Sequence, residues 1–108
     1  MNKDCIFCKI IKKEIPSDIV YEDKDTIAFL DISPINKGHT LVVPKQHYEN
    51  LFDTPENVLL NTIKIVKKIG IALSKYADGV NLGQNNRRAA GQLVDHIHFH
   101  LIPRFNND

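Results

Sequence analysis

Residues 95–104 read DHIHFHLIPR and place three of the chain's five histidines at alternate positions. Because successive side chains of a β-strand point to opposite faces, we expect His96, His98 and His100 to share one face of a strand. The other face carries the apolar residues Ile97, Phe99 and Leu101. This apolar face is predicted to pack on a core. The imidazole face must meet polar partners, since a buried imidazole without one costs about 1–3 kcal/mol.

Four other runs of the chain are rich in residues that favour strands. They are IVYED (19–23), TIAFLD (26–31), HTLVVP (39–44) and GVNLGQNN (79–86). Charged and turn-forming residues separate the first three, which predicts an early antiparallel meander. Together with the histidine strand they predict a five-stranded, mainly antiparallel sheet.

Two helices are predicted beside this sheet. The stretch 9–18, KIIKKEIPSD, indicates a short N-terminal helix that ends before Pro16, because a proline biases the preceding residue out of the helix. The stretch 54–77 predicts one long helix that Thr54 caps and that has Pro55 in its first position. Its apolar positions recur at helical spacing and are predicted to face the sheet: Leu59, Thr62, Ile63, Val66, Ile69, Leu73 and Tyr76. The predicted fold class is therefore α+β.

The composition is that of a single globular domain, predicted to span 1–108. Hydrophobic residues make up 43% of the chain and charged residues 25%, both near the averages of soluble domains. The net charge of +1 argues against an extended nucleic-acid surface and against an electrostatic membrane anchor. No apolar stretch reaches the length of a membrane-spanning helix, and the start MNKDCIFCKI lacks the layout of a secretory signal. We therefore expect a cytoplasmic protein.

Both cysteines, Cys5 and Cys8, lie in one C-x-x-C motif near the N-terminus. In a reducing compartment such a pair indicates a metal or redox site, with a pair of inert buried thiols as the alternative. A thioredoxin-like redox role is less favoured, because the thioredoxin motif follows a strand whereas this C-x-x-C lies near the start of the chain. Two cysteines need two further ligands to complete a tetrahedral zinc site, and the chain offers His39, His47 and the three alternating histidines.

The three alternating histidines have three interpretations from the residues alone. They form a solvated strand face, or they hold a zinc ion that keeps an open position for catalysis, or one of them is a nucleophile that the others assist. If the cysteines and two histidines hold a coordinatively full zinc ion, that metal is structural. Catalysis then belongs to another histidine.

The run HIHFHLI (96–102) matches the histidine-triad pattern, and the chain resembles the HIT family, in particular its Hint-like branch. The blocks CIFCKIIKKEIPSDIVYED, IAFLDISPINKGHTLVVPKQH and GQNNRRAAGQ also resemble family blocks, in family order. The resemblance implies a homodimer whose two sheets join into one, and a purine nucleotide as ligand. It implies cleavage at the α-phosphorus of nucleoside phosphoramidates or mixed anhydrides through a covalent nucleotidyl-histidine, here on His98.

The resemblance also implies roles for the other residues near the histidines. The backbone carbonyl of His96 would orient the His98 ring, His100 would donate to the phosphate or leaving group, and His39 would belong to the supporting hydrogen-bond network. The nucleotide-binding residues would be Asp31 on the ribose hydroxyls, Asn85 and Gln92 near the phosphate or leaving group, and Phe7, Ile10, Phe29 and Ile32 around the base. The ligands of a structural Zn²⁺ would be Cys5, Cys8, His47 and His96.

Several of these residues also have a purely structural interpretation. Asp31 fits a turn, His39 fits a strand edge, and the four apolar residues fit a core. Many relatives carry Ser or Thr after the glutamine of the GQ pair, whereas this chain has Leu93, so a contact there can only come from the backbone. The arginines Arg87 and Arg88 either attract an anionic substrate or form a solvated turn.

Three functions from different classes therefore stand side by side. The first is a nucleotide hydrolase or transferase that acts through His98. The second is a regulatory or scaffold module that binds purine nucleotide and zinc with negligible turnover. The third is a zinc hydrolase with an open metal on His96 and His98, which leaves the cysteines without a role.

Overall fold

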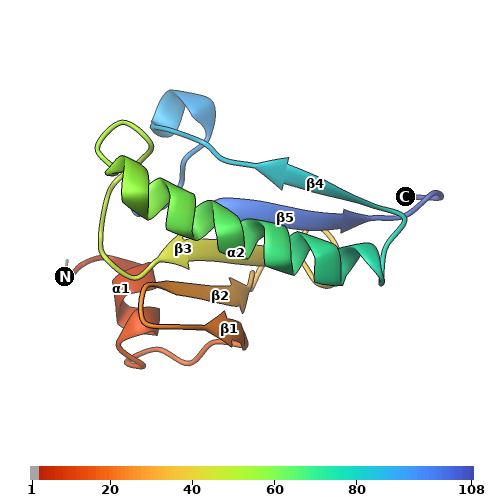
Figure 1. The fold of residues 1–108 in the computed structure, drawn as a ribbon, viewed down its shortest axis with the longest axis horizontal. Coiled ribbons are helices and arrows are strands. Elements are labelled where there is room, and N and C mark those ends of the chain that lie inside the picture. Colours follow the sequence, from red (N-terminus) through yellow and green to blue (C-terminus); the bar gives the residue numbers. More distant parts are fainter. Residues whose placement is uncertain (1–2) are drawn as a thin grey trace.

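The computed structural model describes residues 3–108 as one antiparallel sheet with a helix on each face (Figure 1). The strands are β1 (Ile19–Glu22), β2 (Thr26–Leu30), β3 (Thr40–Pro44), β4 (Gly79–Gly83) and β5 (Phe99–Arg104), and the helices are α1 (Ile6–Ile11) and α2 (Glu56–Ser74). The sheet order is β1-β2-β3-β5-β4, and every neighbouring pair is antiparallel. This confirms the predicted fold class. Met1 and Asn2 of the predicted domain lie outside the described residues.

Alternate residues of the central strands feed two separate apolar clusters. On β2, Ile27 and Phe29 pack with α1, whereas Ala28 packs on the α2 side. This is the period of two expected for a sheet that is covered on both faces. The alternating histidine strand predicted only the cluster under α2, and the cluster under α1 includes Phe7, Ile10 and Phe29, for which a core was the alternative interpretation.

The long helix α2 crosses the sheet and is shorter than predicted (Figure 1). Its cap position is Pro55, whose side chain has no atom that could accept a hydrogen bond, and the hydroxyl of Thr54 donates to the Asn50 carbonyl. The predicted cap was therefore wrong. The buried residues of α2 are Thr62, Ile65, Val66 and Ile69. Among the residues predicted to face the sheet, Ile63 and Tyr76 are exposed.

The short helix α1 begins earlier than predicted, because the C-x-x-C motif starts it. Cys5 is the cap residue, and its thiol accepts a hydrogen bond from the backbone N–H of Cys8. The helix ends at Ile11, and the chain then turns through Lys13 with a φ of 65°. The prediction of helix up to Pro16 was therefore wrong, since Lys13 has already left helical geometry.

The histidine segment alternates as predicted, although the strand covers only its second half. β5 begins at Phe99, while Ile97 donates its backbone N–H to the Tyr48 carbonyl outside the sheet. Ile97, Phe99 and Leu101 belong to the cluster under α2, which confirms the apolar face. The histidines accordingly lie on the α1 face.

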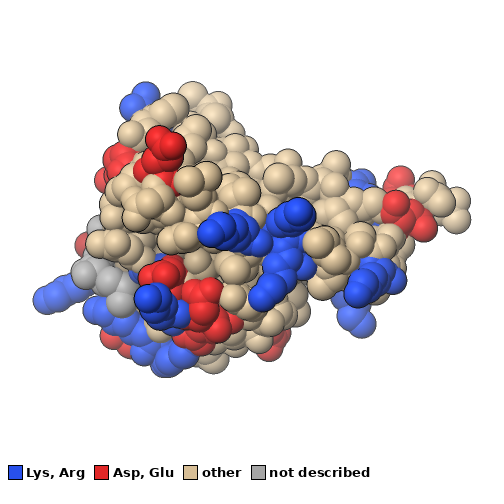
Figure 2. Space-filling model, in the orientation of Figure 1, with Lys and Arg blue, Asp and Glu red and all other residues tan. Residues whose placement is uncertain are grey.

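The outer surface of α2 carries both basic and apolar side chains. Lysines 64, 67 and 68 are exposed on this helix. Figure 2 shows basic side chains gathered along the face that α2 covers, with acidic side chains beside them. No helix among residues 3–108 is long and apolar enough to cross a membrane.

Candidate functional site

An apolar cavity of about 350 Å³ lies on the α1 face of the sheet, beside two of the three alternating histidines. Seven residues that the sequence analysis assigned to nucleotide binding or catalysis line it, together with Leu93: Phe7, Ile10, Phe29, Asp31, Ile32, His98 and His100. The structure thus brings the predicted base slot, ribose carboxylate and two histidines to one cavity. Further lining residues that sequence reasoning missed include Ile15, Pro16, Ser17 and Val94.

His98 is held in one orientation by the backbone. Its Nδ1 lies 2.7 Å from the carbonyl oxygen of His96, so Nδ1 carries the proton and donates it. The lone pair of Nε2 is then available to attack. The ring is buried and meets Phe7 edge-on, with the two ring centres 5.1 Å apart. Burial lowers the pKa of His98, which keeps the imidazole neutral at neutral pH.

A chain of hydrogen bonds sets the tautomers of His39 and His100. The backbone N–H of Ile35 donates to Nδ1 of His39 over 3.2 Å, so the proton of the neutral ring lies on Nε2. That Nε2–H faces Nδ1 of His100 over 3.0 Å. His100 therefore accepts at Nδ1 and carries its own proton on Nε2. Burial lowers the pKa of both rings, which favours these neutral forms.

Asp31 lies at the edge of this chain of hydrogen bonds. Its Oδ1 accepts from the backbone N–H of Ser33, and its Oδ2 lies 3.6 Å from Nε2 of His39. Asp31, His39 and His100 offer ligand atoms close enough together for a metal ion. A metal on Nε2 of His39 would move the ring proton to Nδ1, where it would face the N–H of Ile35. The donor pattern therefore favours a hydrogen-bond network over a metal site here.

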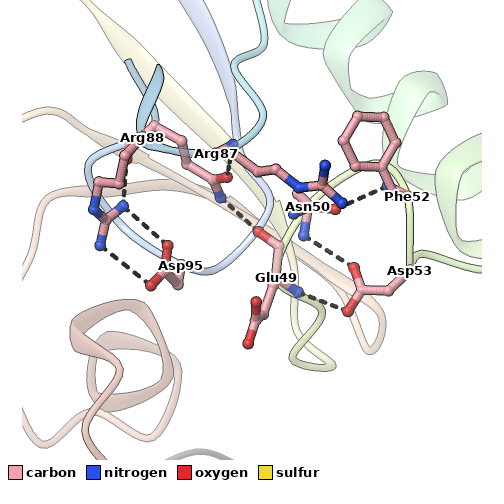
Figure 3. A pocket seen from close by; sticks show the side chains of 8 residues that line it. Glu49, Asn50, Phe52, Asp53, Arg87, Arg88 and Asp95 are labelled. Carbon is pink, nitrogen blue, oxygen red and sulfur yellow. Dashed lines mark hydrogen bonds and ion pairs between the residues drawn. The ribbon is translucent and has the colours of Figure 1, made fainter. Parts of the chain in front are cut away.

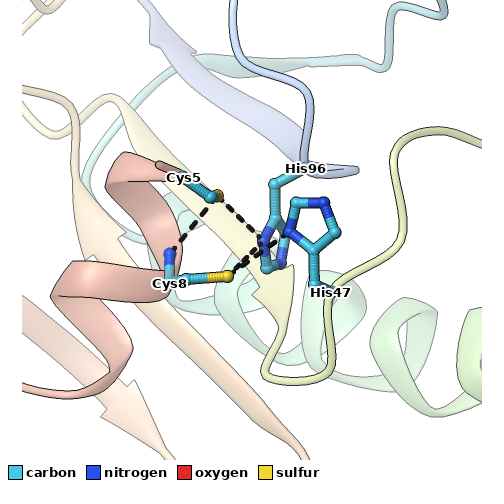
Figure 4. A group of neighbouring side chains, drawn as sticks. All are labelled: Cys5, Cys8, His47 and His96. Carbon is cyan, nitrogen blue, oxygen red and sulfur yellow. Dashed lines mark hydrogen bonds between the residues drawn. The ribbon is translucent and has the colours of Figure 1, made fainter. Parts of the chain in front are cut away.

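A second cluster on the same face joins both cysteines to two histidines (Figure 4). Nδ1 of His96 lies 3.4 Å from Sγ of Cys5 and 3.6 Å from Sγ of Cys8, and Nδ1 of His47 lies 3.3 Å from Sγ of Cys8. Both cysteines are buried and free. These are the four residues that the family resemblance assigned to zinc.

The donor set and spacing of this cluster fit a tetrahedral zinc ion. Bonds of about 2.3 Å to sulfur and about 2.0 Å to nitrogen place neighbouring tetrahedral ligands roughly 3.5 Å apart, close to the observed spacings. Nε2 of His96 lies 2.7 Å from the Pro44 carbonyl and donates to it, which leaves the Nδ1 lone pair for a metal. Four protein ligands fill the site, so the open metal site considered for His96 and His98 has no support from this geometry.

The loop between β4 and His96 is held by its own side chains (Figure 3). Gln92 is only 1% exposed, and its amide accepts from the N–H of Arg87 and donates to the carbonyls of Glu49 and Val94. All three hydrogen bonds of the Gln92 amide are therefore made with backbone atoms, whereas the sequence predicted that this amide contacts a phosphate or leaving group. Asn85 is half-buried in the same loop. Among the described residues, neither amide lines the apolar cavity.

The two arginines of this loop have protein partners. Arg88 forms a two-pronged ion pair with Asp95, with distances of 2.9 and 3.2 Å, and also donates to the Gln92 carbonyl. The guanidinium of Arg87 lies 4.6 Å from the ring centre of Phe52. Both border a charged cavity of about 420 Å³ that is separate from the histidines. These contacts favour the interpretation of the arginines as structural residues of a turn.

Comparisons with known proteins agree with this geometry. Residues 12–107 match the model of the HIT domain. An uncharacterised HIT-like protein of Methanocaldococcus jannaschii is 58% identical, and the match covers 96% of this chain and 81% of that protein. An adenosine 5′-monophosphoramidase of Saccharomyces cerevisiae is 49% identical, with 96% of this chain and 65% of that protein covered.

A solved structure extends the likeness to a metalloprotein. The crystal structure of a Zn-bound histidine triad family protein from Mycobacterium smegmatis is 40% identical to this chain. It superposes with a TM-score of 0.93 and covers 97% of this chain and 78% of its own. The HIT-domain model matches most of the length of this chain, and the chain therefore belongs to the HIT family.

Proposed function

We propose that the chain hydrolyses or transfers nucleotides by cleaving at the α-phosphorus of purine nucleoside phosphoramidates or related conjugates. The observation that carries the proposal is the His98 ring, whose Nδ1–H is held by the His96 carbonyl while the ring lines an apolar cavity beside His100. The similarity to a phosphoramidase at 49% identity supports the same chemistry.

The reaction runs in two displacements. Nε2 of His98 attacks the α-phosphorus, the bond from phosphorus to the leaving nitrogen breaks, and its electron pair goes to that nitrogen. The Nε2–H of His100 donates a hydrogen bond to the leaving nitrogen, and the leaving amine takes the proton that it needs from solvent. Water then attacks the phosphorus, loses its proton to solvent, and releases the nucleotide as the bond to His98 breaks. The His96 carbonyl stabilises the positive charge on the His98 ring between the two steps.

The same cavity binds the nucleotide in this proposal. The rings of Phe7 and Phe29 and the side chains of Ile10 and Ile32 enclose the base. The carboxylate of Asp31 accepts from the ribose hydroxyls, since it can accept two hydrogen bonds at once. Asn85 contacts the phosphate or leaving group. Gln92 acts on the same contact by holding the loop that carries Leu93 against the cavity.

The zinc ion of the proposal is structural. Held by Cys5, Cys8, His47 and His96, it joins α1 and the segment after β3 to the histidine strand, and its binding free energy adds to folding stability. His96 thereby holds its carbonyl, the acceptor of the His98 proton, in place. Zinc thiolates need reduced cysteines, so we place the protein in the cytoplasm.

A homodimer completes the proposed assembly. β4 is an outer strand of the sheet, and its Leu82 is 57% exposed. On α2, next to it, Leu60, Ile63 and Ile71 are also exposed. An outer strand with unpaired backbone groups beside exposed apolar side chains fits a second copy that continues the sheet.

The test is the hydrolysis of adenosine 5′-phosphoramidate by the wild type and by His98→Ala, both checked for folding and zinc content. A fall in kcat/KM of at least about 10³-fold in a folded, zinc-loaded variant is expected. Equal activity in both proteins would refute the covalent mechanism. Wild-type protein that binds AMP but turns over no substrate would instead indicate the binding module.

A further inference from the structure

One buried hydroxyl at the nucleotide cavity has no partner within the protein. Among residues 3–108, the Oγ of Ser17 is the only buried side-chain nitrogen or oxygen without a hydrogen bond. Ser17 lies between α1 and β1 and lines the apolar cavity next to Ile15 and Pro16. Native proteins pair nearly all of their buried polar groups, so such an exception needs an explanation.

Ser17 lies beside the strand that leads to Asp31, the proposed ribose-binding carboxylate. The backbone N–H of Leu30 donates to the carbonyl of Asp18 over 2.9 Å, and Ser17 and Asp31 are the chain neighbours of these two residues. The hydroxyl therefore lies on the same wall of the cavity as the proposed ribose carboxylate. Rotation about the single χ1 bond of a serine moves its Oγ between three staggered positions without any backbone movement.

The other side chains that line the cavity indicate which kind of group would pair with the Ser17 hydroxyl. Ile10, Ile15 and Phe29 offer only carbon to a bound base. A purine carries acceptor nitrogens in its ring, and burying them against carbon alone would lose their hydrogen bonds to water. A serine hydroxyl can donate to such an acceptor.

We propose that Ser17 is a specificity-determining residue that donates a hydrogen bond to a ring nitrogen of the bound purine. The inference rests on the proposed function, because it names part of the ligand that the same cavity recognises. The hydroxyl is left unpaired in the free protein and gains its partner when the base enters.

The test measures dissociation constants of AMP and of ribose 5-phosphate, which lacks the base, for the wild type and Ser17→Ala. Ser17→Ala is expected to weaken AMP about 3- to 10-fold, the effect of one neutral hydrogen bond, and to leave ribose 5-phosphate unchanged. The matched control is Ser74→Ala, which removes an exposed hydroxyl at the end of α2 and should change neither constant. Unchanged AMP binding by Ser17→Ala, or an equal loss for both ligands, would overturn the inference.

Two further measurements separate this role from a structural one. Without ligand, Ser17→Ala should melt at the same temperature as the wild type or a few degrees higher, because it removes an unpaired buried hydroxyl. A lower melting temperature would mean that the hydroxyl has a partner in the free protein, which contradicts the inference.

The second measurement uses AMP analogues in which carbon replaces one ring nitrogen at a time. One of them should bind the wild type and Ser17→Ala equally, and a constant difference across all of them would also overturn the inference. Wild-type protein that fails to bind AMP refutes the proposed function together with this inference. Wild-type protein that binds AMP as tightly as Ser17→Ala does refutes the inference alone.

Discussion

Acid should destabilise the metal-free protein, because the His96 ring is buried in its neutral form. The side chain is fully buried, and burial lowers its pKa from 6.5 to about 4. In the unfolded chain the ring takes up a proton near pH 6.5, whereas in the folded protein it stays neutral down to about pH 4. The unfolded state therefore binds more protons between these values, and stability is complete above pH 6.5 and lost as the pH falls.

The magnitude follows from the two pKa values. The difference between 6.5 and about 4 corresponds to a loss of about 3 kcal/mol in the free energy of unfolding, at 1.36 kcal/mol for each pH unit. That is a large share of the roughly 5–15 kcal/mol that stabilises a typical domain. His39, His98 and His100, whose pKa values burial also lowers, should add to the loss with the same sign.

The assay is urea unfolding in the presence of a chelator at a series of pH values from 7.5 to 4. His96→Gln should show a shallower pH dependence than the wild type, with the two stabilities converging in acid. His47→Gln, the matched control, removes a metal ligand but keeps His96, so the steep dependence should remain. Identical pH dependence in the wild type and His96→Gln would refute the assignment of a buried, neutral His96.

Four other changes have defined outcomes. Cys8→Ser, or chelation of the wild type, should remove zinc, as measured by metal analysis, and lower the melting temperature. Zinc at about 1,000 times its dissociation constant would add about 4 kcal/mol to the free energy of unfolding. An unchanged melting temperature would contradict the structural role of the metal. The fall of kcat/KM in acid solution should have its midpoint below pH 6.5, because burial lowers the pKa of His98; a midpoint above pH 6.5 would contradict this. Ile97→Ala should cost about 2–5 kcal/mol in urea unfolding, because Ile97 is 1% exposed under α2. Gln92→Ala should cost about 1–3 kcal/mol in the same assay, and a neutral result would show that its amide does not hold the loop.

The two faces of the histidine strand were predictable, because a period of two determines which side chains share a face. Once apolar residues alternate with histidines, the apolar set must share a face, and Ile97, Phe99 and Leu101 do pack under α2. The clustering of Cys5 and Cys8 with His47 and His96 followed from the family resemblance and is found in the structure. Spacing alone left the choice of the two histidines open.

The buried face of α2 was harder to predict, because its apolar arc is wider than the face that the sheet covers. Both Ile63 and Ile65 are apolar, but Ile65 is 9% exposed and Ile63 is 42% exposed. Only the position of the helix over the strands decides between them. The surplus apolar side chains form the surface on which we place the second copy.

The roles of Gln92 and Ser17 depend on contacts between segments far apart in the chain. Gln92 donates to the Glu49 carbonyl, 43 residues away, and no local pattern indicates this. Ser17 stands in a turn-forming stretch where serine is common, and only the folded structure shows that its hydroxyl is covered without a partner. Local sequence signals cannot report on such distant partners.

The most direct test of the covalent mechanism is the stereochemical course at phosphorus. A substrate made chiral at the α-phosphorus by sulfur substitution is hydrolysed in isotopically labelled water, and the configuration of the product is determined by phosphorus NMR. Attack by His98 followed by attack of water inverts the configuration twice, so the account predicts net retention. Net inversion would mean that water attacks the substrate directly, and it would contradict the assignment of His98 as nucleophile.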